Sequence, residues 1–294
     1  MAPNEHNNIA SQPVGRESPA LCFVRVLGSP FLRGPGIKCI VSIFTNFFLL
    51  QYRAAFFKGR YPVARADHPL DEKIPFTPRK VNIYLDFVAF WVRVIGFLLR
   101  HYGRQGLEPA KELIESIGKL YKKAAGVYGV CFSTTNRPFY LARPRFVIIH
   151  ATDPHLMCIP SLHVMVVIHT YTLFRELIRR LGGEAQFAPQ IEEMRKGALD
   201  ITEAVLYVKQ HSVNCIPAAM YAMTCFDSAL FTPEEARGFC AELFLNAPSI
   251  TKTDGDAIRA HILSLYQRFI AEGEKSEKWE TPLLDFLFSL PKAK

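Results

Sequence analysis

The sequence lacks several features that would settle its class at once. Its seven cysteines are odd in number and scattered, without a Cys-x-x-Cys pair, so neither a disulfide framework nor a zinc ribbon is indicated. It contains no internal repeat and no low-complexity tract. Residues 1–19 are polar and lack the basic-then-apolar order of a signal peptide, so we expect a disordered tail there. A reducing compartment fits best.

The composition lies between soluble and membrane proteins. Hydrophobic residues make up 49% of the chain and include 23 Phe, which is rich for a soluble enzyme. The 35 Lys and Arg outnumber the 27 Asp and Glu, and the net charge of +8 suits phosphate groups or an anionic lipid surface. No nucleic-acid-binding motif accompanies this charge, so we expect no nucleic-acid partner.

Two apolar segments near the N-terminus indicate contact with a membrane. Residues 39–52 form an uncharged run of 14, a length more typical of a buried or interfacial helix than of a spanning one. Basic residues follow this run and suit an anionic surface: Arg53, Lys58, Arg60 and Arg65. Residues 81–100 are long enough to cross, but Asp86 and Arg93 would be costly facing lipid. Seven residues apart, these two fall on nearly one helical face and could point into a bundle.

The later segments complete the expected organisation. Residues 154–174 carry no Lys, Arg, Asp or Glu, whereas 190–209 is too charged in its first half to span a membrane. We therefore predict an all-α, membrane-associated helical bundle with short or partial spans. Its parts would be N-terminal apolar and basic helices over 20–69, a core over 70–229, and a soluble helical extension over 230–294.

The C-terminal extension shows ordinary helix signals. Thr232, Pro233 and Glu235 have the pattern of an N-cap, an N1 proline and a capping-box glutamate. Apolar residues then recur at helical spacing before Gly273, namely Ile258, Ile262, Leu265, Phe269 and Ile270. We assign them to packing.

A Pro-Ser-Leu-His tetrapeptide, residues 160–163, opens the apolar segment. Taken alone, it is explained by Ser161 as a helix cap and His163 as a core residue. However, His211 follows 48 residues later. If one helix runs away from His163 and another returns to His211, the two imidazoles meet at one end of the bundle. Facing histidines suggest a nucleophile and a general acid.

Candidate phosphate ligands lie nearby in the sequence. Arg137 and Arg143 each precede a proline, and a guanidinium holds a phosphoryl group with two parallel hydrogen bonds. Either arginine could instead anchor a loop. Ser161 at a helix start adds a hydroxyl and unpaired N–H groups. Lys209 is as well explained by a solvated charge as by a phosphate contact. His155, His163 and His169 lack the usual spacing of zinc ligands, so we expect no metal site.

Three blocks stand in a recognisable order: "RPFYLARP" at 137–144, "PSLH" at 160–163 and "LYVKQH" at 206–211. With them the chain resembles the type 2 phosphatidic acid phosphatase superfamily, which includes lipid phosphatases, class A acid phosphatases and vanadium haloperoxidases. The branch of inositol-phosphorylceramide synthases is most similar, because "DEKIPFTPRKVNIYL" at 71–85 and Asp153 also resemble it. The resemblance covers roughly residues 70–226.

The resemblance implies a helical bundle in which His211 attacks phosphorus and His163 protonates the leaving oxygen. Arg143 or Arg137, with Ser161 and Lys209, would bind the phosphate. The implied activity is a phosphatase or phosphotransferase acting on a phospholipid or polyprenyl phosphate monoester, without a metal or other cofactor.

The third block departs from the family pattern. Its Ser-Arg or Ser-Thr falls on Ala204 and Val205, and its Asp falls on Cys215. In the first block, the family's Lys falls on Asn136. A nucleophilic histidine needs an acceptor on its other ring nitrogen, and a neutral thiol is a poor one. Asn214 could offer a carbonyl instead. Two readings therefore stay open: a weakened enzyme that Cys215→Asp would improve, or a silent relative that binds lipid or protein.

Overall fold

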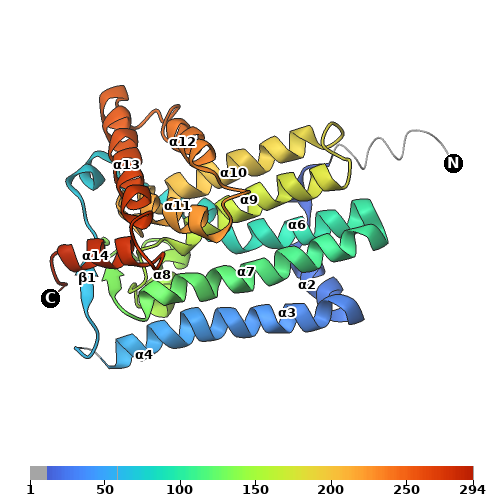
Figure 1. Cartoon of the computed structure of the whole chain (residues 1–294), viewed down its shortest axis with the longest axis horizontal. Helices are drawn as coiled ribbons and strands as arrows, with labels where there is room; N and C mark the ends of the chain where they lie inside the picture. The colour runs from blue at the N-terminus through green and yellow to red at the C-terminus, as the bar shows by residue number, and fades with distance from the viewer. Residues whose placement is uncertain (1–11, 58, 294) are drawn as a thin grey trace.

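The computed structural model describes residues 12–57 and 59–293. The chain is mostly helical, with 70% of its residues in helices, as the sequence predicts. The long helices run side by side along the longest axis of the molecule, and α13 crosses one end of them (Figure 1). Two short strands interrupt the expected all-α architecture.

The N-terminal segment corrects one expectation. Residues 1–11 of the predicted disordered tail lie outside the described residues, but residues 12–19 are ordered. They form the 3₁₀-helix η1 (Val14–Arg16) and lead into α2 (Pro19–Gly28). The backbone N–H groups of Val14 and Gly15 donate to the Glu193 carboxylate at 2.8 and 2.7 Å. Polar composition predicted disorder here because this distant carboxylate cannot be read from the local sequence.

The apolar run 39–52 belongs to a longer helical stretch than expected. α3 (Pro30–Ile43), the π-helical turn η2 (Phe44–Leu49) and α4 (Leu50–Phe56) join into 27 residues, long and apolar enough to cross a membrane. Many of its apolar side chains are exposed, among them Ile37, Ile40, Val41, Phe44, Phe48 and Leu49. The stretch therefore presents an apolar face to its surroundings.

The segment 81–100 divides at Asp86 into α5 (Val81–Leu85) and α6 (Phe87–Tyr102). The Arg93 guanidinium donates to both carboxylate oxygens of Asp86, at 2.6 and 2.8 Å. The sequence placed these two residues on one helical face, and the structure confirms it. The 3₁₀-helices η3 (Pro69–Lys73) and η4 (Pro78–Lys80) precede α5, and η5 (Gly103–Gly106) links α6 to α7 (Leu107–Tyr128). Together, Pro78–Tyr128 form the second stretch apolar and long enough to cross a membrane, although more than half of its most apolar part is buried.

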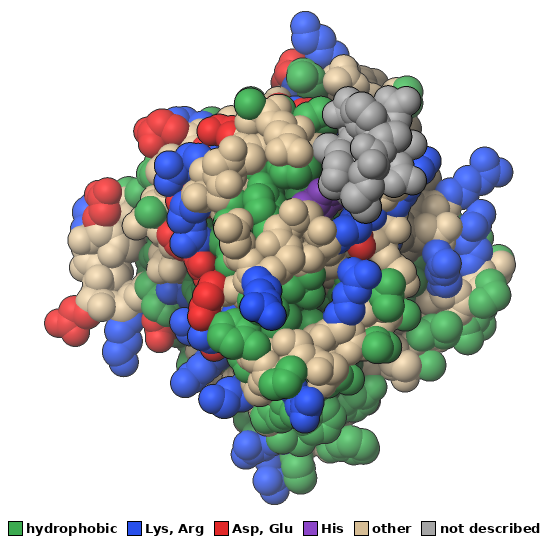
Figure 2. Space-filling model, turned by 90° about the vertical axis from the view of Figure 1, so that its right-hand side faces the viewer, with side chains coloured by type: hydrophobic (Ala, Val, Ile, Leu, Met, Phe, Trp, Pro, Cys, Tyr) green, Lys and Arg blue, Asp and Glu red, His purple; other side chains and the backbone are tan. Residues whose placement is uncertain are grey.

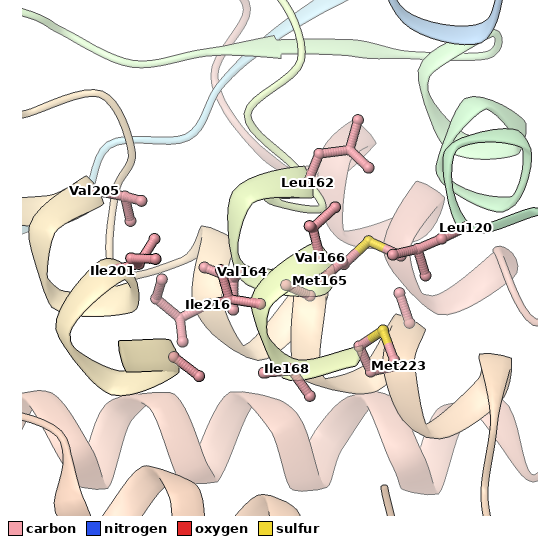
Figure 3. Packing of buried hydrophobic residues seen from close by; sticks show 14 of the residues in the cluster. Leu120, Leu162, Val164, Met165, Val166, Ile168, Ile201, Val205, Ile216 and Met223 are labelled. Carbon is pink, nitrogen blue, oxygen red and sulfur yellow. The ribbon is translucent and has the colours of Figure 1, made fainter. Parts of the chain in front are cut away.

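α9 (Leu162–Arg180) lies at the centre of the core. It packs against α6, α7, α10 (Ala188–Tyr207) and α11 (Cys215–Phe226). Its side chains Val164, Met165, Val166 and Ile168 are fully buried and lie among residues of α7, α10 and α11 (Figure 3). A helix that is apolar on nearly all sides has to be covered on all sides. The uncharged segment 154–174 is thus a core helix with α8 (Pro144–Thr152) before it.

The C-terminal extension packs on this core through α13. It contains α12 (Pro233–Glu242), α13 (Lys252–Gly273) and α14 (Thr281–Ser289). The predicted packing residues Ile258, Ile262 and Phe269 are fully buried. Thr232 caps α12 by accepting from the N–H of Glu235 at 3.2 Å. The Glu235 carboxylate, however, pairs with Arg175 at 2.8 Å instead of closing a capping box.

A small sheet ties distant parts of the chain together. β1 (Val63–Arg65) and β2 (Phe132–Thr134) pair in parallel. The last described residues flank β1 on its other side: Arg65 N–H donates to the Pro291 carbonyl at 2.7 Å, and Ala293 N–H donates to that of Val63 at 2.8 Å. Ser133 also bridges to Met157, just before α9. The three expected parts of the chain therefore meet at this sheet.

One end of the bundle carries the end of α2 and the beginning of α3 (Figure 1). The lower part of this face is hydrophobic or basic, while acidic side chains gather higher and to one side (Figure 2). The exposed residues of this region include Leu27, Phe31 and Ile37. Such a mixture of apolar and basic side chains is typical of surfaces that bind anionic lipid.

Candidate functional site

His163 and His211 meet at one end of α9. His163 lies in the first turn of α9, and α10 returns the chain to a loop that carries His211. The Nε2 atom of His211 lies 3.3 Å from Nδ1 of His163, with the ring planes inclined at 69°. The two imidazoles, 48 residues apart, are thus brought together as the sequence predicts.

Ser161 is the third side chain at this point. It caps α9, because its Oγ accepts from the N–H of Val164 at 3.5 Å. The same Oγ lies 3.3 Å from Nε2 of His211. A helix N-terminus has N–H groups without helical partners and a partial positive charge, so an anion near Nε2 would be stabilised.

A backbone carbonyl fixes the tautomer of His211. Its Nδ1 lies 3.2 Å from the carbonyl oxygen of Cys158. A carbonyl can only accept, so Nδ1 carries the proton and Nε2 of the neutral ring presents its lone pair to His163 and Ser161. The acceptor that the sequence appeared to lack is therefore supplied by the main chain.

Cys215 and Asn214, which the sequence offered as positions for that acceptor, form hydrogen bonds with other groups. Cys215 Sγ accepts from the N–H of Ser212 at 3.4 Å. The Asn214 side chain donates to the Ala66 carbonyl at 3.1 Å, and its Oδ1 lies 2.8 Å from Nε2 of His261 on α13. Neither side chain bonds to His211.

The loop that carries His211 is held from several directions. The N–H groups of Gln210 and His211 both donate to the Val205 carbonyl, at 3.1 and 3.2 Å. Lys209 has a left-handed backbone with φ of 55°. Its ammonium donates to the carbonyls of Asp71 and Ile74, which ties the loop to η3. Lys209 lines a separate open hollow of about 540 Å³, together with Asn136 and Asp71.

Two aromatic side chains pack against His163 and shield part of its ring from water. Tyr84 stacks on its ring at 4.5 Å between centroids, and Phe87 lies at 4.2 Å. Burial lowers the pKa of His163 to about 4. Burial also lowers the pKa of His211 well below its usual value, and a positive charge on His163 would lower it further. Both rings are neutral at pH 7, and a bound phosphate anion would raise both pKa values.

The two candidate arginines are placed differently. Arg137 reaches the neighbour of His211: its Nη1 donates to Gln210 Oε1 at 3.2 Å, and its Nη2 donates to the Asp153 carbonyl at 2.9 Å. Arg143 stands at the beginning of α8, where its side chain forms no hydrogen bond or ion pair with the described residues. The structure thus distinguishes the two arginines, which the sequence alone could not: Arg137 lies next to the site and Arg143 stands at the start of α8.

Sequence reasoning assigned no role to a polar group that lines the same site. Asp153 accepts from the N–H of His155 at 2.9 Å and from Gln51 Nε2 at 3.1 Å, and lies 3.5 Å from Arg137 Nη1. Burial would raise the pKa of Asp153, but the hydrogen bond and charge of His155 and the charge of Arg137 lower it to about 2. The one signal in the sequence was Asp153 itself, seven residues before Pro160.

The cavity between these side chains is small. A cavity of about 20 Å³ is lined by His163, His211, Asp153, His155 and Cys158, among others. This volume holds one water molecule and no phosphate group. Occupation by a phosphate ester therefore requires side chains at the partly exposed edge, such as His163 and Asp153, to move apart.

In the part of the chain that the structure describes, no three His, Cys, Asp or Glu side chains gather as ligands for a metal ion. The site is defined as a histidine pair at a helix N-terminus, with His211 buried, His163 partly exposed and one arginine beside them. No family model, no curated protein and no solved structure matches the chain.

Proposed function

We propose that the chain is a membrane-associated member of the type 2 phosphatidic acid phosphatase superfamily. It acts as a phosphatase or phosphotransferase on a lipid-linked phosphate monoester. The observation that carries the proposal is the 3.3 Å approach of His211 Nε2 to both His163 and Ser161, with the proton of His211 fixed on Nδ1. An unprotonated Nε2 atom beside a second imidazole and an anion-binding helix N-terminus is suited to nucleophilic attack on phosphorus.

In the proposed reaction, Nε2 of His211 attacks the phosphorus atom and the bond to the lipid oxygen breaks. His163, protonated once the phosphate anion is bound, gives its proton to that leaving oxygen. Water or a second alcohol then attacks the phosphohistidine, with His163 accepting its proton, and His211 is released. The carbonyl of Cys158 accepts from Nδ1 throughout and stabilises the positive charge on the ring.

Three groups support binding of the phosphoryl oxygens. Ser161 and the first N–H groups of α9 lie beside Nε2. Arg137, held by Asp153 and Gln210, is the nearer arginine. The membrane would supply the substrate, since the stretch Pro30–Phe56 exposes an apolar face and Gln51 on α4 bonds to Asp153.

A silent relative that binds lipid or protein is the second candidate. The cavity of about 20 Å³ favours it, because a phosphate does not fit without rearrangement. Ala204 and Val205, at the positions of two family ligands, are fully buried in the core and offer no polar group. The two candidates differ in whether a covalent phosphoenzyme forms.

Trapping the intermediate distinguishes them. The purified full chain in detergent is incubated with a panel of ³²P-labelled lipid phosphates, quenched in alkali, and analysed for an alkali-stable, acid-labile phosphohistidine. The enzyme predicts phosphate release and a label that disappears in His211→Ala. His163→Ala should slow formation of the label. If the chain binds vesicles but shows neither the label nor phosphate release, the second candidate, a silent relative, is supported.

A further inference from the structure

A thiol and an imidazole face each other in the lining of the cavity that His163 and His211 also line. The Sγ atom of Cys158 lies 3.7 Å from Nε2 and 4.0 Å from Nδ1 of His155. Both side chains are buried, and both line the cavity of about 20 Å³. The proposed phosphoryl transfer uses the carbonyl of Cys158 and leaves its sulfur without a role.

His155 is held in place for this contact. Its N–H donates to Asp153 Oδ1 at 2.9 Å, its Nδ1 lies 3.8 Å from Asp153 Oδ2, and its Nε2 lies 2.8 Å from Thr135 Oγ1. Its backbone is left-handed, with φ of 59°. A non-glycine residue in this region is strained and is kept there by its surroundings.

The His155 imidazole is held as a base beside the sulfur of Cys158. Asp153 and Thr135 fix the ring with its Nε2 atom 3.7 Å from Sγ of Cys158. An imidazole at this distance can take the thiol proton while the sulfur attacks and can then pass the proton to a leaving group. Elsewhere burial raises the pKa of Cys131, Cys225 and Cys240, which keeps these sulfurs as thiols.

The size of the cavity selects the reagent. About 20 Å³ admits one molecule close in size to water. Hydrogen peroxide is only slightly larger, whereas an aromatic disulfide or a bulky alkylating agent is excluded. Phe47, Asp153 and His163, which also line the cavity, are partly exposed and place it near the surface.

We propose that Cys158 is a peroxide-reactive thiol whose oxidation disturbs the histidine pair beside it. His155 takes the thiol proton of Cys158 while the sulfur attacks one oxygen of hydrogen peroxide, an S–O bond forms, and the O–O bond breaks. The departing hydroxide takes the proton of the His155 imidazolium and leaves as water, so that Cys158 becomes a sulfenic acid. Because the carbonyl of the same residue holds His211, a larger group on its sulfur displaces the loop that orients the ring.

Labelling with dimedone, which traps sulfenic acids, tests the chemical step without any assay of phosphate. The full chain in detergent is treated with a small excess of hydrogen peroxide at pH 7. At intervals it is unfolded in guanidinium chloride that contains dimedone, because the cavity of the folded chain excludes dimedone, and it is then digested for mass spectrometry. We expect Cys158 to be labelled about tenfold faster than Cys225, which is the more exposed of the two. His155→Asn, chosen because Asn tolerates a left-handed backbone, should lower the rate at Cys158 by about tenfold. Equal rates at both cysteines, or no effect of His155→Asn, would overturn the proposal.

A second arm measures the consequence for the site. Peroxide should abolish the phosphate release of the wild type, and dithiothreitol should restore it. Cys158→Ser should keep its own starting activity after the same treatment. If the chain releases no phosphate at all, the proposed function fails while the labelling result still decides the thiol chemistry. If activity is present but peroxide leaves it unchanged although Cys158 is labelled, the coupling to His211 is refuted.

Discussion

The carbonyl oxygen of Cys158 lies 3.2 Å from Nδ1 of His211 and is the acceptor that fixes the tautomer of that ring. In the family that the sequence resembles, an aspartate four residues after the histidine would take this place. Here the loop before α9 supplies a neutral acceptor from the main chain. A carbonyl stabilises an imidazolium less than a carboxylate does, so the site fixes the proton but lends less basicity.

Cys215→Asp is expected to destabilise the protein and not to activate it, contrary to what the sequence alone suggests. Cys215 is fully buried, bonds to Ser212 N–H and does not reach His211. An uncompensated buried carboxylate costs about 3 kcal/mol or more. Urea unfolding of the variant in detergent should show this loss. Normal stability together with faster phosphate release would show that the aspartate does reach His211.

Arg137→Lys and Arg143→Lys form a matched pair. Arg137 is held beside His211 by Gln210 and Asp153, while Arg143 has no such partners. Loss of a bidentate guanidinium at a phosphoryl group should lower kcat/KM about 100-fold for Arg137→Lys. Arg143→Lys should stay within about threefold. The opposite order would move the phosphate ligand to Arg143.

Stability should fall as the pH drops below about 6.5. Burial lowers the pKa of His169 to about 4, so the unfolded chain binds the proton first and stability is lost between the unfolded and the folded pKa. At pH 5 this histidine alone accounts for about 2 kcal/mol. His169→Gln can keep the contact with Ser116, which lies 2.7 Å from His169 Nε2. Between pH 7 and pH 5, the melting temperature of the variant should therefore fall less than that of the wild type. Parallel losses would assign the effect to other groups.

Charges on α3 and η2 should weaken membrane binding. Val41 and Phe44 are 54% and 58% exposed, so replacing both with Asp leaves the core intact. Losing two apolar anchors and adding two anionic groups should reduce partition into anionic lipid vesicles by about 100-fold. Phe288→Asp, equally exposed at 58% but on α14, is the control. Unchanged sedimentation of the double variant with vesicles would place the membrane contact elsewhere.

Local patterns in the sequence were sufficient for much of the fold. The helical spacing of Ile258, Ile262 and Phe269 predicted their burial, and the spacing of Asp86 and Arg93 predicted a shared face. The meeting of His163 and His211 followed from one helix running out and the next returning. The roles of the two rings as acid and nucleophile stay a prediction.

What escaped prediction depends on contacts between distant segments. Glu193 orders residues 12–19 from a helix far along the chain. The sequence gives no sign that the carbonyl of Cys158 is the acceptor for His211, since every residue has a backbone carbonyl. The strands β1 and β2 are three residues each, too short to show an alternating pattern. The arrangement of Asp153 and Arg137 likewise arises only when α8 and the loop before α9 are in place.

The small sheet has a consequence for folding of the chain during its synthesis on the ribosome. β1 is synthesised more than 200 residues before the segment 291–293, which covers one of its two edges. Until then the backbone groups of Val63 and Arg65 on that edge are open, and an open edge can pair with another chain. Without residues 291–293 this edge would stay open, so nascent chains that lack them should bind chaperones longer and aggregate more than chains that contain them.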